Sequence, residues 1–155
     1  MFKSPTCTSQ DRRMAARMAR IANVSLEELG RSIFSASASE DRPVEDLLFT
    51  DFKEFHIAGH FFGVSQITCV DSPHLLVRKE EFLAVMRRTM EEKGYSMMIL
   101  MLTDVLLEGT QLIYLGDEDT IRQAFNADVR DNEVFLPKVM SRKKQIIPML
   151  TALWG

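Results

Sequence analysis

The first part of the chain carries apolar residues at helical spacing. Met14, Met18 and Ile21 follow one another at intervals of four and three residues, which places them on one face of a helix. Thr8 or Ser9 can accept hydrogen bonds from the first amide groups of that helix, so we expect the helix to begin there. The spacing therefore predicts a helix that Asn23 ends.

Two more helices are predicted before the pattern changes. Ser25 and Glu28 have the spacing of a capping box, in which the side chain of each residue satisfies a backbone amide of the other. A short helix over 43–48 follows, and Pro43 fits its first turn because that position needs no amide hydrogen.

From residue 52 onward, strands and helices alternate. Phe52–Ile57 and 61–70 are rich in aromatic and β-branched residues and flank an Ala-Gly pair at 58–59, which predicts a hairpin. Lys79–Lys93 returns to helical spacing and is followed by Gly94, a typical residue at the C-terminal end of a helix. The sequence therefore combines both element types in one continuous stretch.

The pattern of the remaining segments defines the fold class. Residues 97–102 are apolar on both faces, as expected of an interior strand covered by helices on each side. The pattern predicts a mixed β-sheet flanked by helices in a single α/β domain. We expect residues 1–8 to be the remnant of an interdomain linker and residues 9–155 to form the domain. The other predicted elements are strands at 111–115 and near 134–136, a helix capped by Asp117 that ends near Asn126, and a C-terminal helix.

Composition narrows the class of partner. The chain has 46% apolar and 26% charged residues and a net charge of -3, so it has no overall positive field that would attract nucleic acid or an anionic membrane. Cys7 and Cys69 are too few for a disulfide framework and suit a reducing compartment. Residues 1–10 lack the apolar core of a secretory signal. These features predict a cytoplasmic protein that binds anions only where a local cluster of bases exists.

Such a cluster lies near the C-terminus, at Arg142-Lys143-Lys144. The ring of Pro148 would clash with the carbonyl of Lys144 if both lay inside an α-helix, so we expect the terminal helix to begin near Lys144. Arg142 and Lys143 would then lie at its N-terminus. A helix N-terminus favours acidic residues by about 0.3–1 kcal/mol each, so three consecutive bases are unfavourable there unless an anion is bound. The residues alone leave two interpretations open: a phosphate site and a solvated basic turn.

The same segment carries a resemblance to a known family. The run Ser-Arg-Lys-Lys-Gln at 141–145, followed by Ile-Ile-Pro, resembles the C-terminal signature of the manganese-dependent, family II inorganic pyrophosphatases. In that family an N-terminal domain, named for its Asp-His-His motif, precedes a C-terminal associated domain of the second type. Weaker resemblances, spread along the chain, are Phe-Lys-Ser-Pro-Thr at 2–6, Asp-Phe-Lys at 51–53, Gly-Val-Ser-Gln at 63–66 and Leu-Thr-Asp at 102–104.

The resemblance implies a set of site residues. Lys53, Arg142 and Lys143 match the family's cations that act on the substrate during catalysis. Arg142 would bind phosphate oxygens with two parallel hydrogen bonds, and the lysines would act as point charges. The substrate-binding set that the resemblance implies is Lys53, Ser141, Arg142, Lys143 and Lys144, with framing roles for Ser141 and Gln145.

The resemblance also implies cofactors and partners. Manganese, or cobalt or magnesium, would be held by an upstream Asp-His-His domain, and no metal is expected in this chain, which lacks that motif. Pyrophosphate would be the substrate, and the upstream domain of the same protein would be the structural partner. The full-length protein could form a homodimer, and neither nucleic acid nor a membrane is expected to bind. The isolated chain is expected to be inactive.

Two alternative functions remain open. Prune-like proteins and short-chain exopolyphosphatases resemble the same two-domain plan, so longer phosphate chains are a second substrate class. A non-catalytic module that binds a phosphorylated ligand or a protein is the third hypothesis. His56 and His60 have a spacing that suggests a metal pair, but they flank the predicted hairpin turn and no third ligand has a recognisable spacing, so surface or packing roles are favoured.

Overall fold

The computed structural model describes residues 8–22 and 42–155. The predicted helix from Ser25 lies outside the described residues. The elements, in chain order, are α1 (Ser9–Ala22), α3 (Val44–Thr50), β1 (Phe52–Ile57), β2 (His60–Cys69), α4 (Ser72–Leu76), α5 (Lys79–Lys93), β3 (Met97–Asp104), β4 (Gly109–Leu115), α6 (Glu118–Phe125), β5 (Glu133–Pro137), the π-helical turn η1 (Arg142–Ile146) and α7 (Ile147–Trp154).

The five strands form one mixed sheet in the order β1-β2-β3-β4-β5. β2 and β3 are parallel, whereas the other neighbouring strands are antiparallel. A parallel pair needs a crossover connection, which α4 and α5 provide. All eight residues of β3 are buried, as expected of the central strand. The prediction of an α/β fold with a mixed sheet flanked by helices is confirmed.

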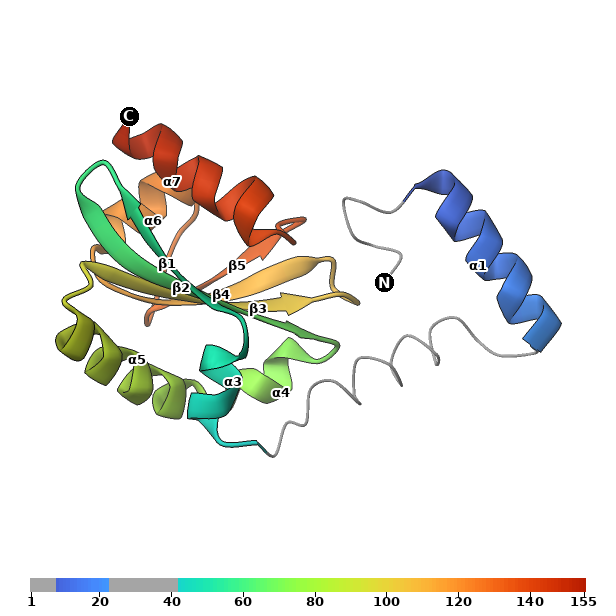
Figure 1. The fold of residues 1–155 in the computed structure, drawn as a ribbon, viewed down its shortest axis with the longest axis horizontal. Coiled ribbons are helices and arrows are strands. Elements are labelled where there is room, and N and C mark those ends of the chain that lie inside the picture. The colour runs from blue at the N-terminus through green and yellow to red at the C-terminus, as the bar shows by residue number, and fades with distance from the viewer. Residues whose placement is uncertain (1–7, 23–41) are drawn as a thin grey trace.

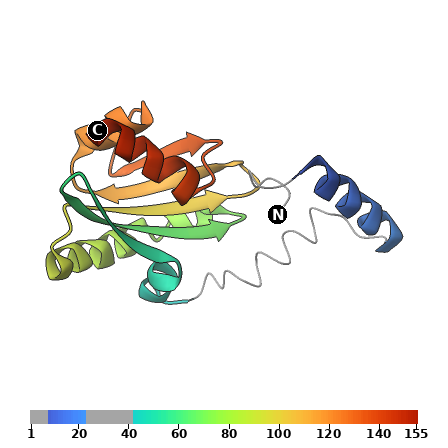
Figure 2. The same ribbon diagram turned by 45° about the horizontal axis from the view of Figure 1, so that its top comes forward.

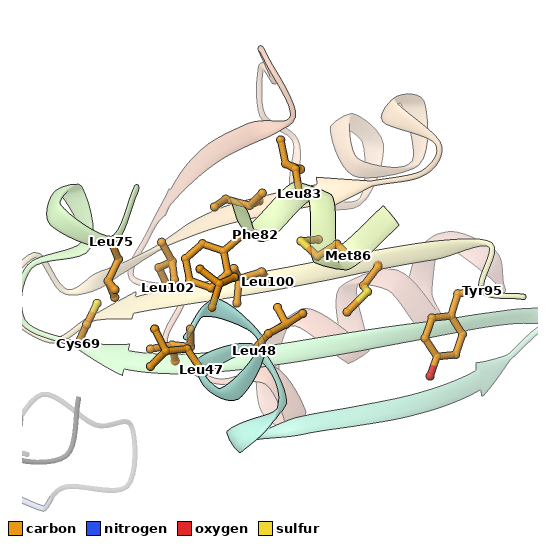
Figure 3. Close-up of a cluster of buried hydrophobic side chains, with 14 residues drawn as sticks. Leu47, Leu48, Cys69, Leu75, Phe82, Leu83, Met86, Tyr95, Leu100 and Leu102 are labelled. Atoms are coloured by element: carbon orange, nitrogen blue, oxygen red, sulfur yellow. The ribbon is translucent and has the colours of Figure 1, made fainter. Parts of the chain in front are cut away.

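Helices cover both faces of the sheet (Figures 1 and 2). α3, α4 and α5 lie on one face, where Phe82 and Met86 of α5 pack against Leu100 and Leu102 of β3 (Figure 3). η1, α6 and α7 lie on the other face, over a second cluster that includes Ile146. Because β3 contributes alternate side chains to the two clusters, its continuous apolar run reflects burial on both sides.

Local signals explain where most elements end. The hairpin between β1 and β2 turns through Ala58 and Gly59, both with positive φ, as a two-residue turn that matches the twist of the strands requires. Gly94 ends α5 in the left-handed conformation and donates its N–H to the carbonyl of Met90 at 2.8 Å. α6 ends at Asn126, where the sequence predicted its end, and Asn126 also has the left-handed conformation.

Several element boundaries differ from the prediction, and one helix was not predicted. β2 covers His60–Cys69 rather than 61–70, and Pro43 is the N-cap of α3 rather than part of its first turn. The five-residue helix α4 was not predicted, because a helix this short shows no periodicity. Its start is nevertheless encoded, since the side chain of Asp71 accepts a hydrogen bond from the N–H of His74 at 3.2 Å.

Gly63 in β2 is required by the packing of the hairpin. A Cβ atom there would lie 2.6 Å from two ring atoms of Phe52 and 3.2 Å from the ring of Tyr95. We expect Gly63→Ala to lower the free energy of unfolding by about 1–3 kcal/mol, because the rings must shift in a packed layer. Urea unfolding of the variant measures this loss. Gly59→Ala is the comparison. Its added Cβ would meet nothing within 4 Å, but φ there is positive, so a loss of stability in that variant reports backbone strain rather than crowding.

Candidate anion-binding site

The guanidinium of Arg142 joins the end of the chain to the start of the sheet. Its Nη1 atom donates to the carbonyl of Asp51 at 2.7 Å and to the carbonyl of Val64 at 3.1 Å. Its Nη2 atom donates to the Asp51 carboxylate at 2.7 Å, and the arginine side chain is only 7% exposed. Arg142 therefore fixes the N-terminus of η1 against the first residues of β1.

This contact links the basic cluster to the strand pair that carries Lys53. Lys53 follows Asp51 by two residues and is paired in register with Val64, whose carbonyl Arg142 contacts. Phe52 packs on the face covered by α3 and α5, whereas Phe55 packs on the face covered by η1 and α7. Because side chains alternate along a strand, Lys53 shares the face of Phe55. Lys53 is thus exposed on the η1 side of the sheet.

The turn that carries the basic cluster is a π-helix, η1, with Ser141 as its N-cap. The Ser141 hydroxyl accepts from the N–H of Lys144 at 3.2 Å. The N–H of Ile147 donates to the carbonyl of Arg142, a spacing of five residues. This wider turn accommodates Pro148, which has no N–H to donate to Lys144 and would clash with its carbonyl in a regular α-helix.

The predicted start of the terminal helix is therefore corrected. Helical structure begins at Arg142 as a π turn and continues as α7 from Ile147, rather than beginning near Lys144. The Pro148 argument assumed α-helical spacing, which a π turn does not keep. Arg142 and Lys143 are consequently the first two residues of the turn, so their backbone N–H groups belong to the end of the helix that lacks intrahelical partners.

The segment before η1 is held by two glutamine side chains. Gln145 accepts at Oε1 from the N–H groups of Met140 and Ser141, at 2.8 and 3.0 Å, and donates from Nε2 to the carbonyl of Lys138 at 3.0 Å. Gln66 of β2 donates to the carbonyl of Met140 at 3.2 Å. These bonds fix the approach to η1 and leave little freedom for the position of Ser141.

The three bases of the cluster face different surroundings. Arg142 is buried, whereas Lys143 and Lys144 are exposed. Both Nη groups of Arg142 are engaged by Asp51 and Val64, so a bidentate grip on phosphate requires an exchange of these contacts. Lys143 and Lys144 of η1 and Lys53 of β1 are exposed, and positive charge beside the backbone N–H groups at the start of a turn suits an oxyanion.

Sequence reasoning gave no role to Asp51 or to Gln66. Asp51 neutralises the buried guanidinium and positions it, and its side chain is 50% exposed beside Lys53. Gln66 connects β2 to the segment before η1. Asp51 begins the Asp-Phe-Lys motif at 51–53, and Gln66 ends the Gly-Val-Ser-Gln motif at 63–66. Their place in these motifs was the sequence signal that could have identified them.

His56 and His60 have packing contacts. His60 stacks on Trp154 of α7 with ring centroids 4.1 Å apart and an interplanar angle of 11°, and His56 lies edge-on to Phe61 at 5.9 Å. Within residues 8–22 and 42–155, no group of three or more histidine, cysteine, aspartate or glutamate side chains is arranged to hold a metal ion. Asp104 has a structural role, since its carboxylate accepts from the N–H groups of Ser72, Leu106 and Leu107 at 2.8–3.0 Å.

The fold and site define a class: an α/β domain with exposed lysines at the start of a π-helical turn. Residues 31–153 match the family described as DHHA2 domain, and the chain belongs to this family. The resemblance stated from the sequence is therefore confirmed. In the described part of the chain no helix is long and apolar enough to cross a membrane.

The relatives are named as pyrophosphatases. The chain is 34% identical over 154 residues to a probable manganese-dependent inorganic pyrophosphatase of Clostridium acetobutylicum, and the match covers 98% of this chain and 50% of the relative. It is 38% identical to a cobalt-dependent inorganic pyrophosphatase of Clostridium perfringens, covering 99% of this chain and 28% of that protein.

A solved structure agrees with these matches. The crystal structure of a putative family II inorganic pyrophosphatase of Methanococcus jannaschii is 34% identical, with a TM-score of 0.81, and the match covers 99% of this chain and 50% of that one. The chain thus spans about half the length of several curated relatives that it matches.

Proposed function

We propose that this chain is the substrate-binding C-terminal domain of a manganese-dependent inorganic pyrophosphatase, which hydrolyses pyrophosphate to two phosphates. The names of the relatives and the shared fold support this proposal. Residues 9–155 would form the domain and residues 1–8 a linker from the preceding half. The protein would act in the cytoplasm, with the preceding domain as its structural partner and a homodimer as the candidate assembly.

The observation that carries the proposal is the contact between Arg142 and the start of β1. Through Asp51 and Val64 it joins the turn that bears Lys143 to the strand pair that carries Lys53. Lys53 and Lys143, which are separated by 90 positions in the sequence, would thereby act on the same phosphate group. A doubly charged phosphate group requires such convergent positive charge, because each cation lowers the energy of the negative charge that develops on the leaving oxygens.

Each residue would have a distinct role. Lys53 and Lys143 would contact phosphate oxygens as point charges, and Lys144 would add positive charge at the rim. Ser141 caps the turn and orients its N–H groups. Arg142 would hold the site together through Asp51 and join the phosphate contacts when pyrophosphate displaces that carboxylate. The metal ions would lie in the preceding domain and supply an activated water.

The proposal is tested by comparing the 155-residue chain with the full-length protein. We expect the full-length protein to release phosphate from pyrophosphate in the presence of manganese, whereas the 155-residue chain should release none above background. A phosphate assay with pyrophosphate and tripolyphosphate in parallel measures both the activity and the substrate class. Hydrolysis by the 155-residue chain at a rate comparable with the full-length protein would contradict the proposal that the metal centre lies elsewhere.

A further inference from the structure

A row of three polar side chains crosses the three middle strands of the sheet, on the face that η1 and α7 cover. The row consists of Gln66 of β2, Thr103 of β3 and Thr110 of β4, and each residue continues the alternation of its strand on the side of the second apolar cluster. Thr103 and Thr110 are paired in register and are at most 2% exposed. A buried hydroxyl is costly unless it is hydrogen-bonded, so the partners of this row decide its role.

The three side chains form one chain of hydrogen bonds that ends on the backbone before η1. Gln66 donates from Nε2 to the Thr103 hydroxyl at 3.0 Å and to the carbonyl of Met140 at 3.2 Å. The hydroxyls of Thr103 and Thr110 lie 3.1 Å apart, and Thr110 donates to the carbonyl of Val139 at 2.5 Å. A hydroxyl has one hydrogen to donate, and Thr110 uses its own on Val139, so Thr103 donates to Thr110. Donation therefore runs in one direction, from Gln66 to Val139, and we call this chain of bonds the relay.

The relay completes the hydrogen bonding of residues 138–141. The N–H groups of this segment donate to the carbonyls of Glu108 and Leu136 and to the side chain of Gln145. The first and last carbonyls of the segment accept from the side chain of Gln145 and from N–H groups of η1. The two middle carbonyls, at positions 139 and 140, accept from the relay. The backbone that leads into η1 is thus held by η1 on one side and by the sheet on the other.

We propose that Thr103 and Thr110 are positioning residues for Lys143, because the relay sets where the backbone of residues 139–141 enters η1. The inference rests on the proposed function, since it concerns the same phosphate site. Neither threonine touches substrate, and both act through the backbone that precedes Lys143 by two residues. A long lysine side chain can follow a bound phosphate, whereas the transition state requires its charge at a defined place. Loss of the relay should therefore lower kcat more than it raises KM.

Two substitutions of Thr110 in the full-length protein separate hydrogen bonding from packing. Valine keeps the shape of threonine without the hydroxyl, whereas serine keeps the hydroxyl and loses the methyl group. We expect Thr110→Val to lower kcat for pyrophosphate about tenfold, with KM changed by less than about threefold, because a small misplacement of a catalytic group is costly. Thr110→Ser should keep kcat within about twofold, because its hydroxyl can still donate to Val139.

Thr89→Val is the matched control. Thr89 is a threonine of α5, on the other face of the sheet, that is 6% exposed and donates from its hydroxyl to the carbonyl of Val85 at 2.8 Å. Its substitution removes a buried hydroxyl that has no part in the relay, and kcat should stay at the wild-type value. Equal kcat values for Thr110→Val and Thr89→Val, or a larger loss in Thr110→Ser than in Thr110→Val, would overturn the proposal.

Hydrogen exchange of the full-length protein tests the relay without catalysis. Amide groups of residues 138–146 should exchange at least about fivefold faster in Thr110→Val than in Thr89→Val, because loss of a bond to the segment raises its local opening. If Thr110→Val does not fold, Gln66→Met takes its place in both measurements, since it removes the first donor and keeps the length of the side chain. Unchanged exchange in the folded variant would overturn the proposal.

The two measurements also separate this inference from the proposed function. A full-length wild-type protein that releases no phosphate from pyrophosphate, together with faster exchange in Thr110→Val, removes the proposed function and retains the relay as the support of η1. An active wild-type protein whose kcat and exchange are both unaffected by Thr110→Val removes only the positioning role.

Discussion

Replacing Lys143 by alanine in the full-length protein should reduce kcat/KM for pyrophosphate by about 10²–10³-fold. A cation that acts on the negative charge of the transition state typically contributes about 3–4 kcal/mol, because the charge is larger in the transition state than in the bound substrate. Lys143 is exposed, and the bonds that hold η1 are made by Ser141, Arg142 and Gln145. The loss should therefore appear in kcat without a loss of stability.

The control for Lys143→Ala is Lys93→Ala, at the exposed end of α5 on the opposite face of the sheet. It removes the same charge from the protein and should leave kcat/KM within about twofold, since surface charges at that separation are largely screened by salt. Retention of hydrolysis by a folded Lys143→Ala variant would contradict the catalytic role of Lys143 and favour a non-catalytic phosphate-binding role for this domain.

Elements whose signals are local could be predicted from the sequence. The helix Lys79–Lys93, its end at Gly94 and the hairpin turn at Ala58 and Gly59 are fixed by neighbouring residues, and the structure has them where the pattern indicates. η1 was missed because a π turn removes the clash that Pro148 would cause in an α-helix. The turn type depends on how residues 138–141 are held, which involves side chains from β2 and η1.

The candidate site was predictable only in part. Arg142 and Lys143 were found from charge at a helix start, but Lys53 entered through the family resemblance alone. Its proximity depends on the pairing of β1 with β2 and on a contact between Arg142 and Asp51, residues separated by 91 positions. Periodicity carries no information about such long-range register. The sequence also could not predict that the Arg142 guanidinium points inward, because arginine is used both to bind phosphate and to form buried ion pairs.

Arg142→Ala should therefore destabilise the domain in the absence of any substrate. Removing one partner of a buried ion pair costs about 3–5 kcal/mol, and we expect about 2–3 kcal/mol here, because the Asp51 side chain is half exposed and can be rehydrated. The carbonyl of Val64 would also lose a donor. Urea unfolding of the 155-residue chain measures the change directly.

Asp51→Asn is the informative companion to Arg142→Ala. It removes the charge but retains an acceptor oxygen, and the two bonds from Nη1 to the carbonyls of Asp51 and Val64 are unaffected. We expect it to lower the free energy of unfolding by about 1 kcal/mol, which is the difference between a hydrogen bond to a charged acceptor and one to a neutral acceptor. If the Arg142 guanidinium instead faced solvent in the absence of phosphate, both substitutions would leave the free energy of unfolding nearly unchanged. An unfolding free energy unchanged by Arg142→Ala would thus leave the residue a purely substrate-facing role, whereas the expected loss would show that its bonds to Asp51 and Val64 hold η1 against the start of β1.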